Sequence, residues 1–443
     1  MFSAVARIFR TPDLRRKIGF TLGIIALFRL GSFIPAPFVD FSNVQTCLQG
    51  LSGSSGSLYD LVNLFSGGAL LKLSIFALGI MPYITASIIV QLLRVVIPHF
   101  DALYKEGQAG QAKLTQYTRY LTIALGVLQS TTLITVARSG ALFSSSSQAE
   151  CSQLIDPAGD TWYGIILMVI TMTAGTGVIM WFGELITERG IGNGMSLMIF
   201  TSIAAQFPNS LGIIAATKGI EILLVVIAIG LLVVVAVIFV EQSQRRIPVQ
   251  YAKRMVGRRT YGGNNTYIPI KVNMAGVVPV IFASSLLYLP ALIAQFNQPA
   301  AGKAPAPWVA WITNYLTKGD HPLYMLLYFL LIVGFTYFYV AITFNPDEVA
   351  DNMKKYGGFI PGIRAGRPTA EYLDYVLTRI TLPGSMYLGF VALIPLIALV
   401  LVGANQSFPF GGTSILIMVG VGLETMKQID SQLQQRHYEG LLR

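Results

Sequence analysis

Long apolar stretches recur along the chain, and they limit the folds that it can adopt. The stretch from Ile222 to Val240 contains no charged residue, and about 20 apolar residues are enough to cross a bilayer as a helix. Only 12% of all residues are charged, which is about half the usual share in globular proteins. Because backbone polar groups find no water inside lipid, stretches of this length must form helices there. The sequence therefore predicts an all-α polytopic membrane protein.

Ten membrane spans are predicted from these stretches. They are Ile18–Ile34, Leu73–Ile97, Tyr120–Ala137, Trp162–Phe182, Ile191–Phe207, Ile222–Val240, Met274–Gln295, Leu323–Phe344, Ile380–Val402 and Ile415–Met426. Two groups of five spans necessarily enter the membrane with opposite orientation, as inverted repeats do. The predicted units are an amphipathic N-terminus 1–17, an N-terminal half 18–207, an external hinge 208–221, a C-terminal half 222–428 and a tail 429–443.

The basic residues predict the orientation of the spans. Of the 31 lysines and arginines, Arg29 and Arg94 fall within spans, five would be external and the other 24 cytoplasmic. Because cytoplasmic loops are enriched in Lys and Arg, both termini are predicted to be cytoplasmic. In the basic N-terminal segment, Thr11, Pro12 and Asp13 are typical of a helix start.

The segment between Ser57 and Pro98 contains two unlike helical pieces. The first, Leu58–Phe65, is amphipathic and too short to span, and paired glycines at 67 and 68 break it from the next. The second, Leu73–Ile97, is long enough to span. The short piece is either a re-entrant helix that only packs, or a movable stopper over a pore. On the long helix, Ile80 and Ile84 would share one face, with Pro82 loosening the backbone between them, so any constriction there would be apolar.

Two long cytoplasmic loops, 241–272 and 345–379, are predicted to be ordered. The first has seven basic residues and one acidic residue, and its alternating flanks predict a hairpin around Gly262 and Gly263. The second has Gly and Pro turns around Arg364 and Arg367. Charge alone fits a topology signal or contact with anionic lipid, whereas the apolar pattern favours a macromolecular partner, either RNA phosphate or an acidic protein face. The glycines at 190, 192 and 194 predict a tight turn rather than a phosphate cradle.

The sequence contains no pattern for catalysis, a metal or a cofactor. The three histidines are scattered over both sides of the membrane, and there is no HExxH or GxSxG motif. Ion-coupled transporters hold ionisable groups at mid-membrane, but here every acid is predicted in a loop or at a span end. Cys47 and Cys151 both fall in predicted external segments, which leaves a disulfide open. These features argue against an enzyme, a carrier and an ion channel.

Several motifs resemble one family closely. They include FSGGALLKLSIFALGIMPYITASIIVQLL, EGQAGQAKLTQYTRY, GELITERGIGNGMS, VEQSQRRIPVQYAKRM, IPIKVNMAGVVPVIFASS, TFNPDEVADNMKKYGGFIPGIRAGRPTAEYL and FGGTSILIMVGVGLETMKQI. Together they resemble the SecY/Sec61-alpha family, whose bacterial members are the pore subunits of the Sec protein translocon. The resemblance implies ten helices in two inverted halves that close like a clamshell around a channel, in a bacterial plasma membrane.

The resemblance also implies site residues. The family's apolar pore ring would be Ile80, Ile84, Met195, Ile199, Ile281 and Ile417. Met195 departs from the isoleucine that is usual in the best-known bacterial form; since methionine is longer and more pliable, we expect the seal to persist. The plug would be the half-helix with Leu58, Leu61, Val62, Phe65, Ser66, Gly67 and Gly68. The lateral gate would have polar positions at Thr85, Gln129 and Asn273, and hydrogen bonds between them would close the seam.

The same resemblance implies partners. The docking positions for the SecA motor or the ribosome would be Arg246, Lys253, Arg258, Arg259 and Arg364. Further expected partners are SecE, SecG, signal sequences, secretory polypeptides and anionic lipids, with SecDF and YidC as additional candidates. Two other functions stay open at this point, an alternating-access carrier with inverted repeats and a membrane scaffold or insertase without a through-pore.

Overall fold

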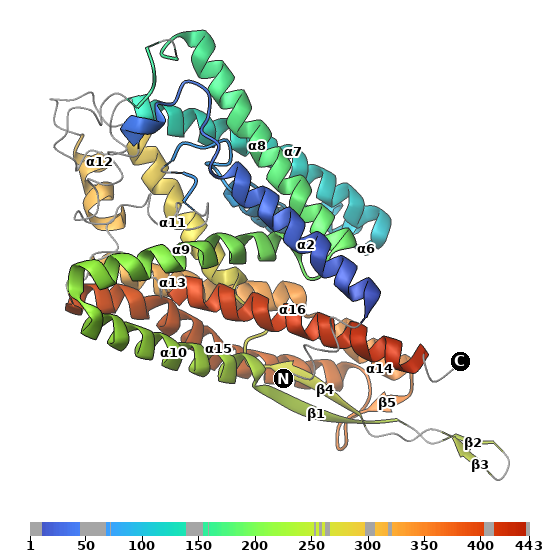
Figure 1. Cartoon of the computed structure of the whole chain (residues 1–443). Helices are drawn as coiled ribbons and strands as arrows, with labels where there is room; N and C mark the ends of the chain where they lie inside the picture. Colours follow the sequence, from blue (N-terminus) through green and yellow to red (C-terminus); the bar gives the residue numbers. More distant parts are fainter. Residues whose placement is uncertain are drawn as a thin grey trace.

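The protein is a helical bundle with a small β-structure at one end (Figure 1). The computed structural model describes residues 11–44, 68–70, 72–138, 154–157, 159–251, 254–256, 259–261, 266–296, 306–317, 321–402 and 412–439. Each of the ten predicted spans overlaps a helix. In order these helices are α2 (Pro12–Gly31), α5 (Met81–Val96), α7 (Gln108–Arg138), α8 (Trp162–Arg189), α9 (Gly194–Lys218), α10 (Ile220–Gln242), α11 (Val278–Phe296), α13 (Pro322–Thr343), α15 (Arg367–Val402) and α16 (Gly412–Glu439).

Length and composition support an all-α polytopic membrane protein. Among the described residues, five helices are long and apolar enough to cross a membrane, namely α7, α8, α10, α13 and α15. The pair α5 and α6 (Pro98–Lys105) would make a sixth, although it is bent by 101°. The other predicted spans fall on helices that are shorter or more polar, so the number ten remains a prediction.

The two halves meet mainly through two helices, α9 and α11. Helices α2, α7 and α8 lie together in one half, and α10, α13, α15 and α16 lie together in the other (Figure 1). Helix α9 packs against α8 in its own half and also against α10 and α16, whereas α11 touches α5 and α7 over a smaller area. The halves are therefore joined firmly through α9 and more loosely through α11.

The start of α5 differs from the prediction. The helix begins at Met81 rather than at Leu73, and the described residues before it form successive turns. Gly79 has a φ of 56°, and Pro82 lies in the first turn, where its missing N–H costs nothing. Pro82 therefore starts the helix instead of loosening its middle. Ile80 precedes the helix, and its carbonyl accepts the first bond from Ile84 N at 3.1 Å.

The predicted hinge is also different. Residues 208–218 continue α9 through Pro208, and α10 begins at Ile220. Only Gly219 separates the two helices, with a φ of 87° that favours glycine. The junction is one residue wide because the apolar pattern of α9 continues after the proline.

The loop after α10 forms the predicted hairpin. Strands β1 (Gln244–Tyr251) and β4 (Thr266–Lys271) pair antiparallel, as do β2 (Arg254–Val256) and β3 (Arg259–Tyr261). Both pairs share one register, in which Val256 pairs with Arg259, and Gly262 and Gly263, where the turn was expected, lie outside the described residues. In Figure 1 the β2–β3 end projects away from the helices.

The second loop supports the base of this hairpin. It contains α14 (Pro346–Lys355) and β5 (Gly358–Phe359), and β5 pairs with the end of β1. Helix α15 already begins at Arg367, well before the predicted span at Ile380. Ile247, Val249 and Ile270 of the hairpin are buried in one apolar cluster with residues of α14 and α15, so the hairpin base is fixed to the bundle. Outside this region lie α12 (Pro307–Ile312) and a π-helical segment, Thr313–Thr317.

Candidate functional site: an apolar ring beside a cavity

The six residues of the expected pore ring lie in one apolar cluster. Ile80, Ile199, Ile281 and Ile417 are buried in its core, and Ile84 and Met195 pack against it. They come from the start of α5, from α9, from α11 and from α16, so both halves contribute. Residues up to 337 positions apart, from Ile80 to Ile417, are brought together by the packing of α9 and α11 between the halves.

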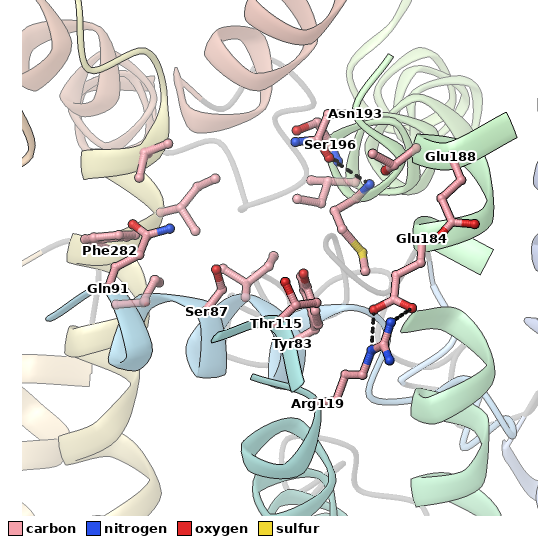
Figure 2. A pocket seen from close by; sticks show the side chains of 17 residues that line it. Tyr83, Ser87, Gln91, Thr115, Arg119, Glu184, Glu188, Asn193, Ser196 and Phe282 are labelled. Atoms are coloured by element: carbon pink, nitrogen blue, oxygen red, sulfur yellow. Dashed lines mark hydrogen bonds and ion pairs between the residues drawn. The ribbon is translucent and has the colours of Figure 1, made fainter. Parts of the chain in front are cut away.

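A cavity of about 430 Å³ adjoins this cluster (Figure 2). Ile84, Met195, Ile199 and Ile281 form part of its apolar wall, with Ile88, Val278 and Phe282. The remaining lining side chains are polar: Tyr83, Ser87, Gln91, Thr115, Arg119, Glu184, Thr187, Glu188, Asn193 and Ser196. The cavity is thus apolar where it meets the ring and carries both signs of charge elsewhere. It could hold water and a flexible chain without binding one particular side chain.

The glycine-rich turn positions Met195 at the cavity. Helix α8 ends at Arg189 and α9 begins at Gly194, which confirms the predicted tight turn. Asn193 caps α9, because its Oδ1 accepts hydrogen bonds from Met195 N at 3.1 Å and Ser196 N at 3.4 Å. A Cβ on Gly194 would lie 1.9 Å from the Gly183 carbonyl oxygen. Only glycine permits this approach of α9 to α8.

Met195 itself packs on the facing helix. A Cβ on Gly183 would lie 2.3 Å from the Met195 sulfur, so the thioether occupies the space that a side chain there would need. The Thr187 hydroxyl donates to the Gly183 carbonyl at 2.9 Å and accepts from Gly194 N at 2.9 Å. These contacts fix the start of α9 and explain how methionine fits at this ring position.

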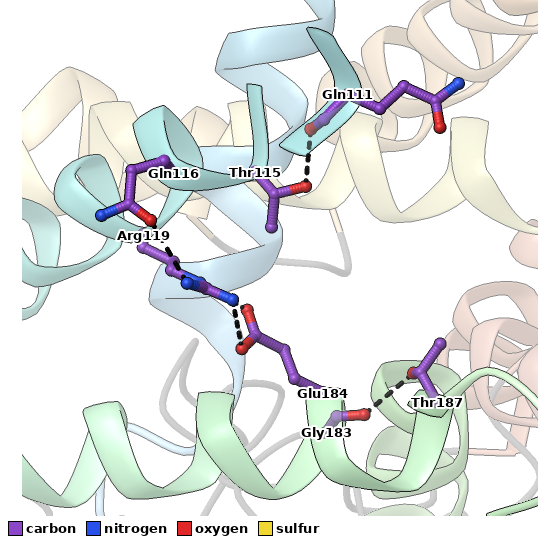
Figure 3. Close-up of polar contacts among 7 residues, drawn as sticks. All are labelled: Gln111, Thr115, Gln116, Arg119, Gly183, Glu184 and Thr187. Carbon is purple, nitrogen blue, oxygen red and sulfur yellow. Dashed lines mark hydrogen bonds and ion pairs between the residues drawn. The ribbon is translucent and has the colours of Figure 1, made fainter. Parts of the chain in front are cut away.

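An ion pair that the sequence analysis missed lies at the cavity wall (Figure 3). Arg119 donates from Nε to Glu184 Oε1 and from Nη2 to Glu184 Oε2, each at 2.8 Å. Its Nη1 also donates to Gln116 at 3.2 Å. The pair connects α7 to α8 beside the ring. A signal existed in the sequence: Arg119 immediately precedes one predicted span, Glu184 closely follows the next, and consecutive antiparallel spans place these ends on the same side.

Comparisons with known proteins identify the family. The sequence model of the SecY family matches residues 74–426. The protein translocase subunit SecY of Streptomyces galbus is 65% identical over the full length of both chains, and that of Micrococcus luteus is 61% identical over the full length of both. The chain belongs to the SecY family. This assignment bears out the expectation that it is a channel-family protein and not an enzyme.

Solved structures support the fold at much lower identity. A structure described as a protein-conducting channel has a TM-score of 0.60 at 18% identity and covers 93% of this chain and 91% of its own. Sec61 in the canine ribosome–channel complex from the endoplasmic reticulum has a TM-score of 0.58 at 17% identity, with the same coverage. At these identities the likeness concerns the fold, so both show that the chain has the architecture of the SecY/Sec61 channels.

The three expected gate residues are not joined to one another in the described part of this SecY-family chain. The Thr85 hydroxyl donates to the Met81 carbonyl of its own helix at 3.0 Å. Gln129 lies half-buried on α7. Asn273 is buried, and its amide donates to Glu241 Oε1 of α10 at 2.5 Å and to the Gly276 carbonyl at 3.1 Å. The expected hydrogen bonds across the seam are therefore absent, because Asn273 is held by its own half.

The expected docking residues are only partly described. Arg246 is exposed on β1, 4.8 Å from the centre of the Tyr267 ring, and Arg364 is exposed before α15. The Arg364 carbonyl accepts a hydrogen bond from the Thr369 hydroxyl at 2.8 Å. Arg259 belongs to β3, and Lys253 and Arg258 lie outside the described residues. Arg246 and Arg364 thus lie on the two loops that β1 and β5 join.

Most of the expected plug lies outside the described residues. This holds for Leu58, Leu61, Val62, Phe65, Ser66 and Gly67, and also for Cys47 and Cys151. Gly68 is described and has a φ of 87°. Within the described ranges, no group of three or more His, Cys, Asp or Glu residues could hold a metal ion.

Charged groups also fix the bend after α5. Asp101 of α6 accepts a hydrogen bond from Lys105 at 2.7 Å and lies 3.9 Å from Arg94. The hydrogen bond from Lys105, followed by the two positive charges, lowers the pKa of the Asp101 carboxyl. Arg94 lies over the Tyr104 ring at 3.3 Å. These contacts hold α6 against the end of α5.

Proposed function

We propose that the chain is the channel-forming subunit of a Sec translocon, which passes unfolded polypeptides across the bacterial plasma membrane. The observation that carries the proposal is the gathering of six apolar side chains from both halves beside a polar cavity. The similarity to protein translocase subunits, 65% and 61% identical over the full length of both chains, supports it independently.

The chemistry of the ring fits this task. An apolar constriction can exclude water and ions by dewetting when it is empty. It has no charge or fixed hydrogen-bond donor, so it would not hold any particular side chain of a passing polypeptide. Four of the ring residues line the cavity, so a chain in the cavity would meet the ring directly.

Sideways release would occur on the looser side of the molecule. Helix α11 meets α5 and α7 there over a small area, and a seam with few contacts can open at low cost. Apolar signal helices gain free energy by leaving an aqueous channel for lipid. Thr85, Gln129 and Asn273 are proposed gate positions, and residues 57–68 are the proposed plug.

The proposed orientation follows from the charge, and the proposed partners follow from the resemblance to the family. An excess of Lys and Arg on the cytoplasmic side would place both termini in the cytoplasm. The basic hairpin and the loop with Arg364 would then face SecA or the ribosome, which would supply the energy for transport. SecE and SecG are the proposed small membrane subunits.

A stalled secretory polypeptide tests the proposal. A photocrosslinking residue at position 84 or 281 should attach to the stalled chain in membranes, because both side chains line the cavity. The same residue at Ile166, whose side chain is 47% exposed on the outside of α8, serves as the control. A scaffold or a small-solute carrier would give a crosslink at neither ring position, and that result would refute the proposed channel function.

A further inference from the structure

A groove at the cytoplasmic edge of the C-terminal half lies outside the channel site. It has a volume of about 390 Å³ and lies between the start of β1, the end of β4 and one face of α15. Arg245, Arg379, Tyr372 and Tyr375 contribute its polar groups, and Ile380 and Pro383 lie at its apolar end. Glu371 and Asp374, the two acids of α15, are not among its lining residues.

The groove is positively charged. Arg379 lies 5.3 Å from the centre of the Tyr375 ring. In the described ranges, the ion pairs of this protein involve other residues, and no carboxylate lies within 4.0 Å of Arg245 or Arg379. Arginine guanidinium groups bind phosphate oxygens with two hydrogen bonds each. Two arginines and two tyrosines that line one groove therefore favour a phosphate group.

The position of the groove along α15 matches the depth of lipid headgroups. The helix has 36 residues, whereas about 20 are needed for the hydrocarbon core. Counting back from Val402, that length ends near Pro383, so Arg379 and Tyr375 extend beyond the hydrocarbon. Tyrosine is enriched at this interface, and arginine stems extend toward headgroups.

An apolar stripe continues from the groove along the same face of α15. Leu382, Met386, Phe390 and Ile394 are spaced by four residues, and each is at least 37% exposed. Residues at this spacing share one helix face, and Tyr375 and Arg379 extend the series toward the groove. The face is thus basic at headgroup depth and apolar below it, as one phospholipid molecule requires.

We propose that the groove between Arg245 and Arg379 is a binding site for the phosphate headgroup of an anionic phospholipid, whose acyl chains lie along Leu382, Met386 and Phe390. The site narrows the general expectation of anionic-lipid contact to one place. It does not depend on the channel function, since it requires only that α15 spans the membrane.

Native mass spectrometry of the full-length chain, purified with its copurifying subunits, tests the site. Phosphatidylglycerol is titrated against a phosphatidylcholine background, and bound lipids are counted. Arg245→Gln and Arg379→Gln should each lower the affinity for one phosphatidylglycerol about fivefold, as expected for one basic residue at an anionic surface. Arg379→Lys should lose less than Arg379→Gln, because it keeps the charge.

The matched control is Arg367→Gln, since Arg367 is on the same helix but is 89% exposed and paired with Glu371. It should leave lipid binding unchanged, and millimolar inorganic phosphate should not displace the lipid. Equal lipid occupancy in all variants, or equal losses in the control, would overturn the proposal. So would displacement by phosphate alone, or loss of a copurifying subunit from the groove variants with lipid binding unchanged.

Discussion

At the scale of single residues, the site depends on close contacts that only certain side chains allow. The start of α9 lies against α8 at two glycines, and Met195 fills the space above one of them. Isoleucine, the residue expected from the family, is branched at Cβ and less able to adapt. Met195 therefore fits at this ring position because residue 183 is a glycine.

Gly194→Ala tests this close approach. Its Cβ would lie 1.9 Å from the Gly183 carbonyl oxygen, and we expect a loss of about 1–3 kcal/mol in stability from overpacking. Gly212→Ala in the same helix is the control, because nothing lies within 4 Å of its Cβ. That variant should be neutral or slightly more stable. Thermal unfolding in detergent measures both, and equal melting temperatures would contradict the packing.

The Arg119–Glu184 pair is testable by a double-mutant cycle. The Arg119 side chain is 40% exposed and that of Glu184 20%, so water screens the pair only in part. Two parallel hydrogen bonds should give a coupling energy of about 1 kcal/mol between Arg119→Ala and Glu184→Ala. The exposed pair Arg367 and Glu371 should give about 0.3 kcal/mol. Chemical denaturation supplies the four stabilities of each cycle. If the coupling energy is no larger than in the exposed pair, the Arg119–Glu184 pair does not stabilise the contact between α7 and α8.

At the scale of elements, the sequence predicted that helices and a hairpin form, but not where they begin and turn. Each predicted apolar stretch overlaps a described helix, since lipid requires helical backbone. The apolar run before Pro82 predicts a helix that already contains this proline, whereas its missing N–H fits the first turn of the observed helix. The run of α9 beyond Pro208 and the early start of α15 depend on packing against other elements. The sequence does not predict the pairing of Val256 with Arg259, because Gly262 and Gly263 are the stronger local turn signal.

Some residues of the candidate site could be predicted from the sequence, and others could be found only in the structure. Resemblance to the family selected six ring residues from distant positions, and the structure brings them together in one cluster. The resemblance implied neither the Arg119–Glu184 pair nor the hydrogen bond from Asn273 to Glu241. The sequence places Arg119 and Glu184 at neighbouring ends of consecutive predicted spans, but which side chains face each other depends on how the helices pack.

The basic hairpin and the neighbouring loop are the proposed docking surface for SecA or the ribosome, and charge reversal there tests it. Arg246→Glu and Arg364→Glu should each reduce binding of SecA or ribosomes to membranes several-fold, because each reverses a charge on the proposed docking surface. The fold should persist, since both side chains are exposed. Arg16→Glu, an exposed position on α2, is the control for a general loss of positive charge. Cosedimentation gives the affinities, and wild-type binding in both variants would rule out the docking surface.

At the scale of the whole molecule, the arrangement is asymmetric. Helix α9 packs against α10 and α16 across the two halves, and only Gly219 separates α9 from α10. Helix α11 meets α5 and α7 more sparsely. The six ring residues include members of both α9 and α11. Motion about the α9 side would part the ring and the seam together, which is how one opening could serve both transport and lateral release.

The most direct test of the account is the ion permeability of the resting protein in planar bilayers. Ile84→Gly combined with Ile281→Gly removes two side chains from the ring, and the resting conductance should rise well above that of the wild type. Ile166→Gly combined with Ile229→Gly is the matched control, since both side chains are 47% exposed on the outside of their helices; its conductance should stay at the wild-type level. If the ring variant conducts no more than the control, the six side chains do not seal a channel.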